Sequence, residues 1–559
     1  MSEVERWVLR RLAMFVGHFT LDAALDVVTS ATLKQSVVLG AIDSLVAKSM
    51  VAARPIGAMM RYRLLDTTRA YALEIGMDEA ELTNLAARHA TYYQRWLEQT
   101  ATEWATSPTG TERAEHFAGL NNVRAALEWC FGKNGDVAIG IRLAAAAAPV
   151  FLAMSLLPEC YRWSERAILA LVDATRGESE EMHLQASLGV ASMHMYGPSD
   201  TARSALSRGL AIAEARGNVP NQVGLLGTLS MFHTRYGEFK IALDYAKRTR
   251  AVAGNVERSA TTALAQSTLG RALHFMGNHG SARAELDAAF QHWTHAQQTY
   301  LGFDDRILVS LGLARTLWVQ GYPAQSMERA RQTITAAERS TNPASLAVAL
   351  AWVPDIFVWT GDLRSAEEHA DRLISHAQSH SLGPYLHVGR GYKGTLAIRR
   401  NDAKRGVETL RDCLERLHAV RYEMRNTEFR IVLAQGLVAI GQVGEGKTLI
   451  DETIRLVQEN GDLFFMPEAL RVKGCVLLSM PEPQTDEAEA CFTQSLEWSR
   501  RQGAHAWELR TATDLADLLA NQGRPESARS LLKPAFEQFA EGFDTADLTA
   551  ARSLLSTLA

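Results

Sequence analysis

The sequence has few cysteines, and none at the spacings through which cysteines usually act. Its 559 residues contain five, each standing alone: Cys130, Cys160, Cys413, Cys475 and Cys491. Because no C-x-x-C pair occurs, the sequence predicts neither a disulfide framework nor a zinc ribbon. Isolated cysteines fit a reducing compartment, and we expect a cytoplasmic protein.

A hydrophobic run long enough to cross a membrane is also missing. The most membrane-like segment, Leu143–Leu157, has 15 residues and contains Pro149. Since a transmembrane helix needs about 20 apolar residues, we interpret this segment as a buried core helix. Glu3 and Glu5 precede any apolar run, which is unlike a secretory signal. We therefore expect no membrane partner.

Neither sign of charge dominates. The chain has 58 Lys and Arg against 63 Asp and Glu, a net charge of −5, which argues against coating nucleic acid through bulk electrostatics. With 47% hydrophobic residues the composition is globular. A chain this long is not expected to form one core, so several domains or a repeat array are predicted.

Catalytic and metal-binding patterns are absent. There is no G-x-S-x-G motif and no Cys–His pairing that the sequence alone supports. His376 and His380, and likewise His292 and His295, could each supply two metal ligands on one helix face, but no third ligand is evident. We interpret them as solvated helix residues. The sequence predicts no catalytic residue, no metal and no cofactor; an enzyme with a site hidden between repeats is the least supported alternative.

What the sequence does contain is a regular series of turn residues, which we call the turn ladder. Steps between them are 40 or 44 residues up to Gly441, a period typical of helical repeat arrays. The ladder comprises Gly197, Gly237, Gly277, Gly321, Gly361, Asn401, Gly441, a break at Pro481–Pro483, and Gly523.

A small residue stands five positions after each ladder residue, counting from Pro483 at the break. These are Ala202, Ala242, Ala282, Ser326, Ala366, Gly406, Gly446, Ala488 and Ala528. Small side chains let paired helices approach closely, as tetratricopeptide-type repeats require. The sequence thus predicts a mainly α protein in which residues 177–559 form a right-handed tetratricopeptide-like superhelix of about nine helix pairs.

The ladder also explains GQVGEGKT at residues 441–448, which matches the phosphate-binding loop G-x-x-x-x-G-K-[ST]. That loop requires a preceding β-strand. Here the preceding segment has a helical period, Gly441 is a ladder residue, and Gly446 is the small residue of its repeat. We therefore predict a helix–turn–helix rather than a nucleotide site.

The N-terminal part has the pattern of a winged helix, which we assign to residues 1–76. Three helical segments are predicted at Trp7–Phe15, from Thr20 to Val28, and at Ser36–Met50. Two short extended runs, Val51–Ala53 and Arg61–Leu65, flank a turn at Pro55–Gly57 and predict a hairpin.

Residues 77–176 are predicted to form a helical bridge between the winged helix and the repeats. Helices are expected at Ala80–Trp104, Thr111–Phe131 and Val137–Leu171, with a break at Ser107–Gly110.

Several segments together resemble bacterial STAND-type regulatory ATPases. They are RRLAMFVGHFTLDAA (10–24), SLVAKSMV (44–51), RYRLLDTTRAYALE (61–74), LNNVRAALEW (120–129) and the end of the chain, residues 508–555. In that family an effector domain and a P-loop ATPase precede the winged helix and the repeats. This chain starts where the ATPase would end. The resemblance therefore implies an ATPase or output module acting in trans, with the winged helix packing against it.

The winged helix lacks the usual chemistry for reading DNA. Its third helix offers Asp43 and Lys48 among apolar residues, and the hairpin adds Arg54, Arg61 and Arg63. Recognition helices normally carry several Arg, Lys, Asn or Gln residues toward the bases. A DNA-binding transcription factor acting through the winged helix is therefore the first alternative to the regulatory function, and DNA is not the expected partner.

Residues at fixed distances before the ladder predict a binding groove on the first helices, which usually line the concave face. The candidates are Arg271, Arg315, Trp318, Trp352, Asp355, Trp359, Arg390, Tyr392 and Arg430. Such polar and aromatic residues suit a partner protein, a peptide or a small effector. Packing of tryptophans between repeats explains the same pattern, so both interpretations stay open. The predicted function is regulatory: filling the groove would change superhelix curvature or winged-helix docking.

Overall fold

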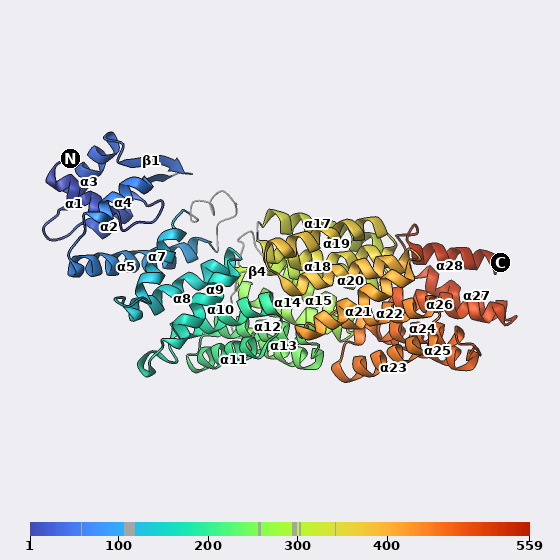
Figure 1. The fold of residues 1–559 in the computed structure, drawn as a ribbon. Helices are drawn as coiled ribbons and strands as arrows, with labels where there is room; N and C mark the ends of the chain where they lie inside the picture. Colours follow the sequence, from blue (N-terminus) through green and yellow to red (C-terminus); the bar gives the residue numbers. More distant parts are fainter. Residues whose placement is uncertain are drawn as a thin grey trace. The chain divides into compact units, whose positions relative to one another are not determined.

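A computed structural model describes residues 1–56, 59–104, 118–254, 259–292, 299–300, 303–340 and 342–558. The chain divides into two compact units, residues 1–188 with 295–302 and residues 189–294 with 303–559. Helices dominate both (Figure 1), so the mainly α fold class predicted from the sequence is confirmed. The finer division at residues 76 and 176 stays a prediction.

The first unit begins with the predicted winged helix. Helices α1 (Glu3–Leu12), α2 (Leu21–Val28) and α3 (Gln35–Ala47) precede an antiparallel hairpin of β1 (Val51–Ile56) and β2 (Met59–Leu64). Thr20 caps α2 as predicted, because its side chain accepts a hydrogen bond from the N–H of Ala23. The first strand is longer than predicted and includes Pro55, which a two-stranded ribbon tolerates. Gly57 lies outside the described residues.

The helices after the hairpin are α4 (Asp66–Glu74), α5 (Glu79–Trp104), α7 (Leu120–Cys130), α8 (Val137–Ala153) and α9 (Leu157–Leu169). The prediction of one helix over residues 137–171 is wrong, because the chain breaks at Ser155, whose φ of 55° cannot continue a helix. The helix predicted from residue 111 is found from Leu120. Residues 105–117, including the predicted break, lie outside the described part.

Helices α5 and α7 complete the core of the winged helix. Asn122 on α7 accepts a hydrogen bond from the N–H of Val16 at 2.7 Å and donates one to the carbonyl of His18 at 2.9 Å. His89 on α5 packs edge-on against Phe15, with ring centroids 5.3 Å apart. These contacts join segments distant in sequence into one compact unit.

The apolar helix α8 is buried, as predicted for residues 143–157. It is not the most membrane-like segment, however, and that prediction is wrong. Among the described residues, the one helix long and apolar enough to cross a membrane is α18 (Pro343–Thr360), and 89% of it is buried inside the protein. A helix that is hydrophobic all round is typical of a core position, and α18 runs through the centre of the repeat array.

The repeat array consists of paired helices, as predicted. Its ladder residues adopt left-handed φ values, from 64° at Asn401 to 91° at Gly361, a conformation that favours glycine. The pairs within the described residues are α10 (Ser179–Tyr196) with α11 (Asp200–Ala215), α12 (Val219–Tyr236) with α13 (Phe239–Ala253), α14 (Ser259–Phe275) with α15 (His279–His292), α16 (Asp305–Val319) with α17 (Pro323–Arg339), α18 with α19 (Leu363–Ser379), α20 (Gly383–Arg399) with α21 (Ala403–Ala419), α22 (Asn426–Ala439) with α23 (Val443–Asn460), α24 (Met466–Leu478) with α25 (Thr485–Gln502), and α26 (His505–Asn521) with α27 (Pro525–Glu537). A last helix, α28 (Ala546–Thr557), follows.

The small residues after the ladder lie in the predicted close contacts. Ala202, Ala282 and Ala366 are fully buried. At Gly406 an added Cβ would lie 2.4 Å from Ile398, so that position admits no side chain without a shift of its neighbours. The tetratricopeptide-like solenoid is therefore confirmed together with the reason for its sequence pattern.

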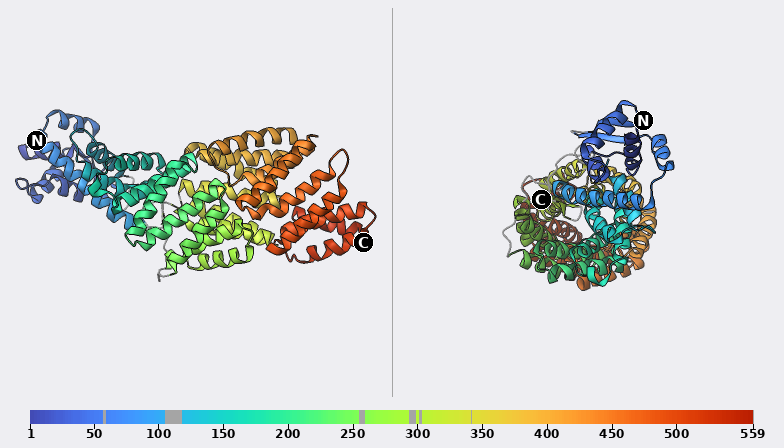
Figure 2. Two further views of the ribbon diagram at one scale, coloured as in Figure 1. Left: turned by 90° about the horizontal axis from the view of Figure 1, so that it is seen from below. Right: turned by 90° about the vertical axis from the view of Figure 1, so that its left-hand side faces the viewer.

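The superhelix packs against itself several repeats later. The N–H of Glu423 donates to the carbonyl of Arg235 at 2.7 Å, and Lys240 donates to the carbonyl of Gln458 at 2.9 Å. Likewise, α16 contacts α26 and α18 contacts α28. Figure 2 shows the helices of these repeats lying together in the array. The concave side is therefore a largely enclosed interior rather than a long open groove.

The segment resembling a phosphate-binding loop has the predicted helical context. Helix α22 precedes it, Gly441 makes the ladder turn, and α23 begins at Val443 inside the motif. Lys447 pairs with Asp451 on the same helix at 3.1 Å. No backbone loop is left to surround a phosphate at these residues.

Candidate functional site

The nine residues predicted for the groove fall into three places. Arg271, Arg315 and Trp352 line one cavity. Trp318, Asp355, Trp359 and Tyr392 are buried beside it, each at most 4% exposed. Arg390 and Arg430 lie elsewhere: Arg430 donates to Thr453 at 3.2 Å and pairs with Glu452. Counting back from the ladder thus brings seven of the nine into one region of the second unit.

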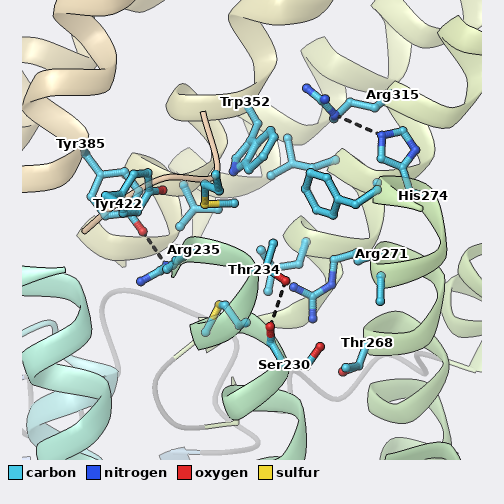
Figure 3. A pocket seen from close by; sticks show the side chains of 18 residues that line it. Ser230, Thr234, Arg235, Thr268, Arg271, His274, Arg315, Trp352, Tyr385 and Tyr422 are labelled. Atoms are coloured by element: carbon cyan, nitrogen blue, oxygen red, sulfur yellow. Dashed lines mark hydrogen bonds between the residues drawn. The ribbon is translucent and has the colours of Figure 1, made fainter. Parts of the chain in front are cut away.

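The cavity lies between consecutive first helices of the repeats. Its walls come from α12, α14, α16, α18 and α20, and the segment joining α21 to α22 adds Tyr422 and Met424. Figure 3 shows its side chains converging from these elements. The centre of a water-sized sphere can move within about 70 Å³ of the cavity, which leaves room for several water molecules or a small ligand group.

Apolar side chains form much of the cavity wall. Met231, Phe275, Leu308, Leu311 and Val348 line it together with Trp352. The rings of Phe275 and Trp352 lie 5.9 Å apart in an edge-to-face arrangement. Such a wall favours a ligand with an apolar or aromatic body.

Arg235 brings a positive charge to one end of the cavity. Its Nη2 donates to the hydroxyl of Tyr385 at 2.7 Å, and its guanidinium lies 5.9 Å from the ring of Tyr422 (Figure 3). The side chain is 3% exposed, yet Nη1 has no hydrogen-bond partner. Among the described residues, no carboxylate lies within ion-pair distance of it. A buried, uncompensated guanidinium is costly and needs an explanation.

Two further arginines reach the cavity. Arg271 donates to the carbonyl of Ser267 at 3.3 Å and approaches Asp305 only to 3.8 Å. Arg315 donates from Nε to Nε2 of His274 at 3.3 Å, and its Nη2 is buried without a partner. The cavity therefore carries three guanidinium groups, and none of its lining residues is acidic.

The protonation of His274 follows from its neighbours. Its Nδ1 lies 3.0 Å from the hydroxyl of Thr316, and that hydroxyl donates to the carbonyl of Gly312. Nδ1 must then carry the proton, so Nε2 is free to accept from Arg315. Burial and the charge of Arg315 hold the pKa of His274 well below its ordinary 6.5, so the ring adds no fourth charge to the cavity.

A buried ion-pair network adjoins the cavity and centres on Asp355. This carboxylate is fully buried and accepts hydrogen bonds from Arg315, from both Nη atoms of Arg425, and from the hydroxyl of Tyr392. The guanidinium groups of Arg315 and Arg425 each lie 4.7 Å from the ring of Trp352, which both therefore contact. Arg315 thus belongs to the network and to the cavity wall at once.

Four aromatic residues fill the interior beyond this network. Trp318 lies 4.4 Å from Trp359 and 4.7 Å from Trp507, and Phe464 lies 5.8 Å from Trp507, between ring centroids. They come from different turns of the superhelix. The indole N–H of Trp359 donates to Glu428 at 3.1 Å, which joins the aromatic cluster to the ion pairs.

Burial shifts the protonation of two carboxyl groups near the network. It raises the pKa of Glu428 to about 7, with the charge of Asp355 adding to the effect. It likewise raises the pKa of Asp462, 1% exposed, to about 7. Burial thus disfavours the charged form of both carboxyl groups, and the charge of Asp355 adds to this effect at Glu428.

Three important residues were missed by the sequence analysis. Arg235 stands two positions before its ladder residue, and Tyr422 and Arg425 lie in the turn between two repeats. Fixed offsets before the ladder mark residues on one helix face. They do not indicate a turn that reaches the interior from a later part of the superhelix.

The paired histidines show no metal-like arrangement. His376 donates from Nε2 to the carbonyl of Pro343 at 2.8 Å, and its ring lies 4.5 Å from that of His380. Within the described ranges, no group of three or more His, Cys, Asp or Glu could hold a metal ion. His292 contacts Gln266 at 3.0 Å, and His295 lies outside the described residues.

The third helix of the winged helix exposes an apolar surface. Val37 is 40% and Leu39 is 39% exposed, whereas Lys48 pairs with Glu5 at 2.6 Å. On the hairpin, Arg61 is buried and Arg63 pairs with Asp66 at 3.0 Å. Arg54 is the hairpin arginine that stays exposed with no ion pair among the described residues, so this face has little of the free positive charge that phosphate contacts require.

Comparisons with known families agree with this architecture. A winged helix-turn-helix domain family matches residues 1–75, and a tetratricopeptide repeat family matches residues 263–288 and 509–534. The repeat matches cover most of the α14–α15 pair and of the α26–α27 pair. Together they establish a winged helix followed by tetratricopeptide repeats.

Curated relatives match part of the chain. "Putative HTH-type transcriptional regulator" proteins of Mycobacterium bovis and Mycobacterium tuberculosis are 34% identical over 163 residues, which is 29% of this chain and 18% of each relative. The chain thus aligns with about a fifth of those relatives' length.

Solved structures with a similar fold include a Rap protein complexed with Competence and Sporulation Factor, with 10% identity, a TM-score of 0.49, and coverage of 65% of this chain and 98% of that chain. A STAND protein with a tetratricopeptide repeat sensor from Pyrococcus horikoshii has 11% identity, a TM-score of 0.32, and coverage of 90% and 64%. At these TM-scores the likeness gives no information on what this chain binds.

Proposed function

We propose that this chain is a regulatory protein without catalytic activity of its own, whose superhelix binds an effector or partner protein. One observation carries the proposal: a single cavity is lined by the first helices of five consecutive repeats, α12 to α20. A ligand in that cavity would contact all five repeats at once. The winged helix-turn-helix match and the regulator relatives support a regulatory role.

The mechanism follows from the way repeat arrays respond to ligands. Each repeat contacts mainly its neighbours, so small changes in the angle between repeats add up along the array. A ligand that binds one curvature better than another shifts the population toward it. The contacts between turns, such as that of Arg235 with Glu423, would then form or break together.

We further propose that the chain works with an ATPase or output module in the manner of STAND-type regulators. The segments at residues 10–24, 61–74 and 120–129 carry that resemblance, and the exposed apolar side chains of Val37 and Leu39 on α3 suit a protein contact better than DNA. Sequencing the genomic region directly upstream tests the idea. An ATPase frame joined to residue 1, or encoded beside it, is expected; a region without one contradicts the proposal.

The binding role is tested with a cavity-filling variant. Ala272 lines the cavity and is 5% exposed, so Ala272→Leu places extra atoms inside it. Ala336→Leu makes the same change on the exposed side of α17 and serves as the control. Thermal-shift screening of the full chain against metabolites and hexapeptides should give stabilising compounds that the first variant loses and the second keeps. Equal binding by both variants contradicts the proposal.

A DNA-binding transcription factor is the second candidate, because the curated relatives are described as putative HTH-type transcriptional regulators. A gel-shift with genomic fragments at physiological salt separates the two functions. Specific retardation that disappears in Arg54→Ala would favour DNA. Because the winged helix exposes little free positive charge, we expect no specific retardation.

A further inference from the structure

The cavity combines an apolar wall with buried positive charge that the protein does not neutralise. Arg235 and Arg315 are each at least 96% buried and each leaves a guanidinium nitrogen without a partner. Buried polar groups are paired in the great majority of cases, and an orphaned charged donor costs more than a neutral one. Such atoms in a cavity wall indicate that the missing partner comes from outside the protein.

The charges around the cavity show which kind of partner is missing. Arg235 has no carboxylate within ion-pair distance among the described residues, and Arg271 has only Asp305 at 3.8 Å. Arg315 shares Asp355 with Arg425. Guanidinium groups bind carboxylate and phosphate oxygens through two parallel hydrogen bonds. The hydrogen bond from Arg235 to the hydroxyl of Tyr385 holds the Arg235 guanidinium in place at the edge of the cavity.

We propose that the cavity binds a ligand with one oxyanion head group, a carboxylate or a phosphate, on an aromatic or aliphatic body. Arg235 and Arg271 hold the head group, and the body lies against Phe275 and Trp352. This inference rests on the proposed binding function and adds the chemical class of the ligand. An anion next to these arginines satisfies the orphaned donor of Arg235 and relieves the repulsion between the two guanidinium groups.

The test uses pairs of probes that differ only in charge. Indole-3-butyrate is compared with indole-3-butyramide, 1-naphthyl phosphate with 1-naphthol, and N-acetyl-leucyl-phenylalanine with its C-terminal amide. Calorimetric titration of the full chain should show the anion of at least one pair binding about tenfold or more tightly than its neutral partner. The pair that responds most strongly distinguishes a small acid, a phosphate and a peptide terminus as the source of the oxyanion.

Variants then assign the effect to the cavity. Arg235→Gln should remove the preference for the anion and leave the affinity for the neutral probe unchanged. Arg430→Gln, an arginine on the same unit that lies outside the cavity, should change neither. Because Arg235→Gln also alters the bond to Tyr385, Arg271→Gln provides a second variant with the same expected loss of preference.

Two results would overturn the inference. One is that anionic and neutral probes bind alike, or that no probe binds at millimolar concentration. The other is that Arg430→Gln lowers anion affinity as much as Arg235→Gln and Arg271→Gln. If neutral compounds bind and Ala272→Leu abolishes that binding, the cavity is a ligand site of another chemical class. The proposed function then stands and the oxyanion does not.

Discussion

Two neighbouring parts of the superhelix interior are built from the same kind of repeat. They differ in whether their buried charges are paired and whether side chains fill the space. Around Asp355 the buried charges are paired and Trp318, Trp359 and Trp507 fill the space. Around Arg235, in the cavity wall, space remains and the guanidinium has no carboxylate partner among the described residues. The repeat geometry is the same in both. The difference shows that side chains, rather than the fold, decide which part is core and which part is available to a ligand.

The largest expected effect comes from breaking the paired part. Asp355→Ala leaves Arg315 and Arg425 buried without their shared carboxylate, which should lower the free energy of unfolding by about 3–5 kcal/mol. Urea unfolding followed by tryptophan fluorescence measures it. Asp451→Ala removes a carboxylate that is 36% exposed and pairs with two lysines, so it should cost about 0–1 kcal/mol. Equal losses would show that the network is no more important than a surface ion pair.

A slightly smaller loss is expected from emptying the filled interior. Trp507→Ala removes a side chain 1% exposed and should lower the free energy of unfolding by about 3–4 kcal/mol. Trp498→Ala makes the same change at a half-buried ring that packs at the edge of the Val457–Met466–Leu470 cluster under Arg501, and a smaller loss of about 1–2 kcal/mol is expected there. Thermal and urea unfolding of both variants make the comparison. A larger loss for Trp498 would contradict the assignment of the core.

The pH dependence of stability probes the buried carboxyl of Asp462. Its pKa is raised from an ordinary 3.8 to about 7, so the folded state keeps a proton that the unfolded state releases. This group therefore contributes most stability below about pH 4 and loses it as pH rises to about 7. Relative to Asp462→Asn, the wild type should lose about 1.4 kcal/mol per pH unit across that window.

Urea unfolding at several pH values between those limits gives the difference between the two proteins. Asp200→Asn, which makes the same substitution at an exposed carboxylate, serves as the control for the substitution itself. A constant difference between the wild type and Asp462→Asn would mean that this carboxyl ionises normally in the folded protein.

The smallest effect is expected where the interior is incomplete. Arg235→Gln removes a buried charge that has no ionic partner, so the unliganded protein should change in stability by no more than about 1 kcal/mol. The same substitution at Arg425, whose guanidinium is paired with Asp355 and Glu428, should cost about 3 kcal/mol or more. Unfolding midpoints without added ligand give both values. A large loss at Arg235 would mean that its charge serves folding rather than binding.

Much of the fold could be predicted because its determinants are local. The positive φ at Gly361 and the buried contact at Gly406 each require a residue without a bulky side chain, and both recur at a fixed spacing. The same spacing placed Arg271, Arg315 and Trp352 on one face, where the structure gathers them around the cavity. Helix breaks were less predictable. Ser155 has a left-handed φ, and a serine does not by itself indicate such a conformation.

The sequence by itself determined the winged helix, the paired helices and the face on which each candidate residue lies, because hydrophobic period and turn residues act over a few positions. Only the tertiary structure decided that the superhelix packs against itself, that Arg425 and Tyr422 reach the interior from a later turn, and that Asp355 is paired whereas Arg235 is not. These outcomes depend on the small angle added at each repeat. Its sum over several repeats brings distant segments together, and no local pattern records that sum.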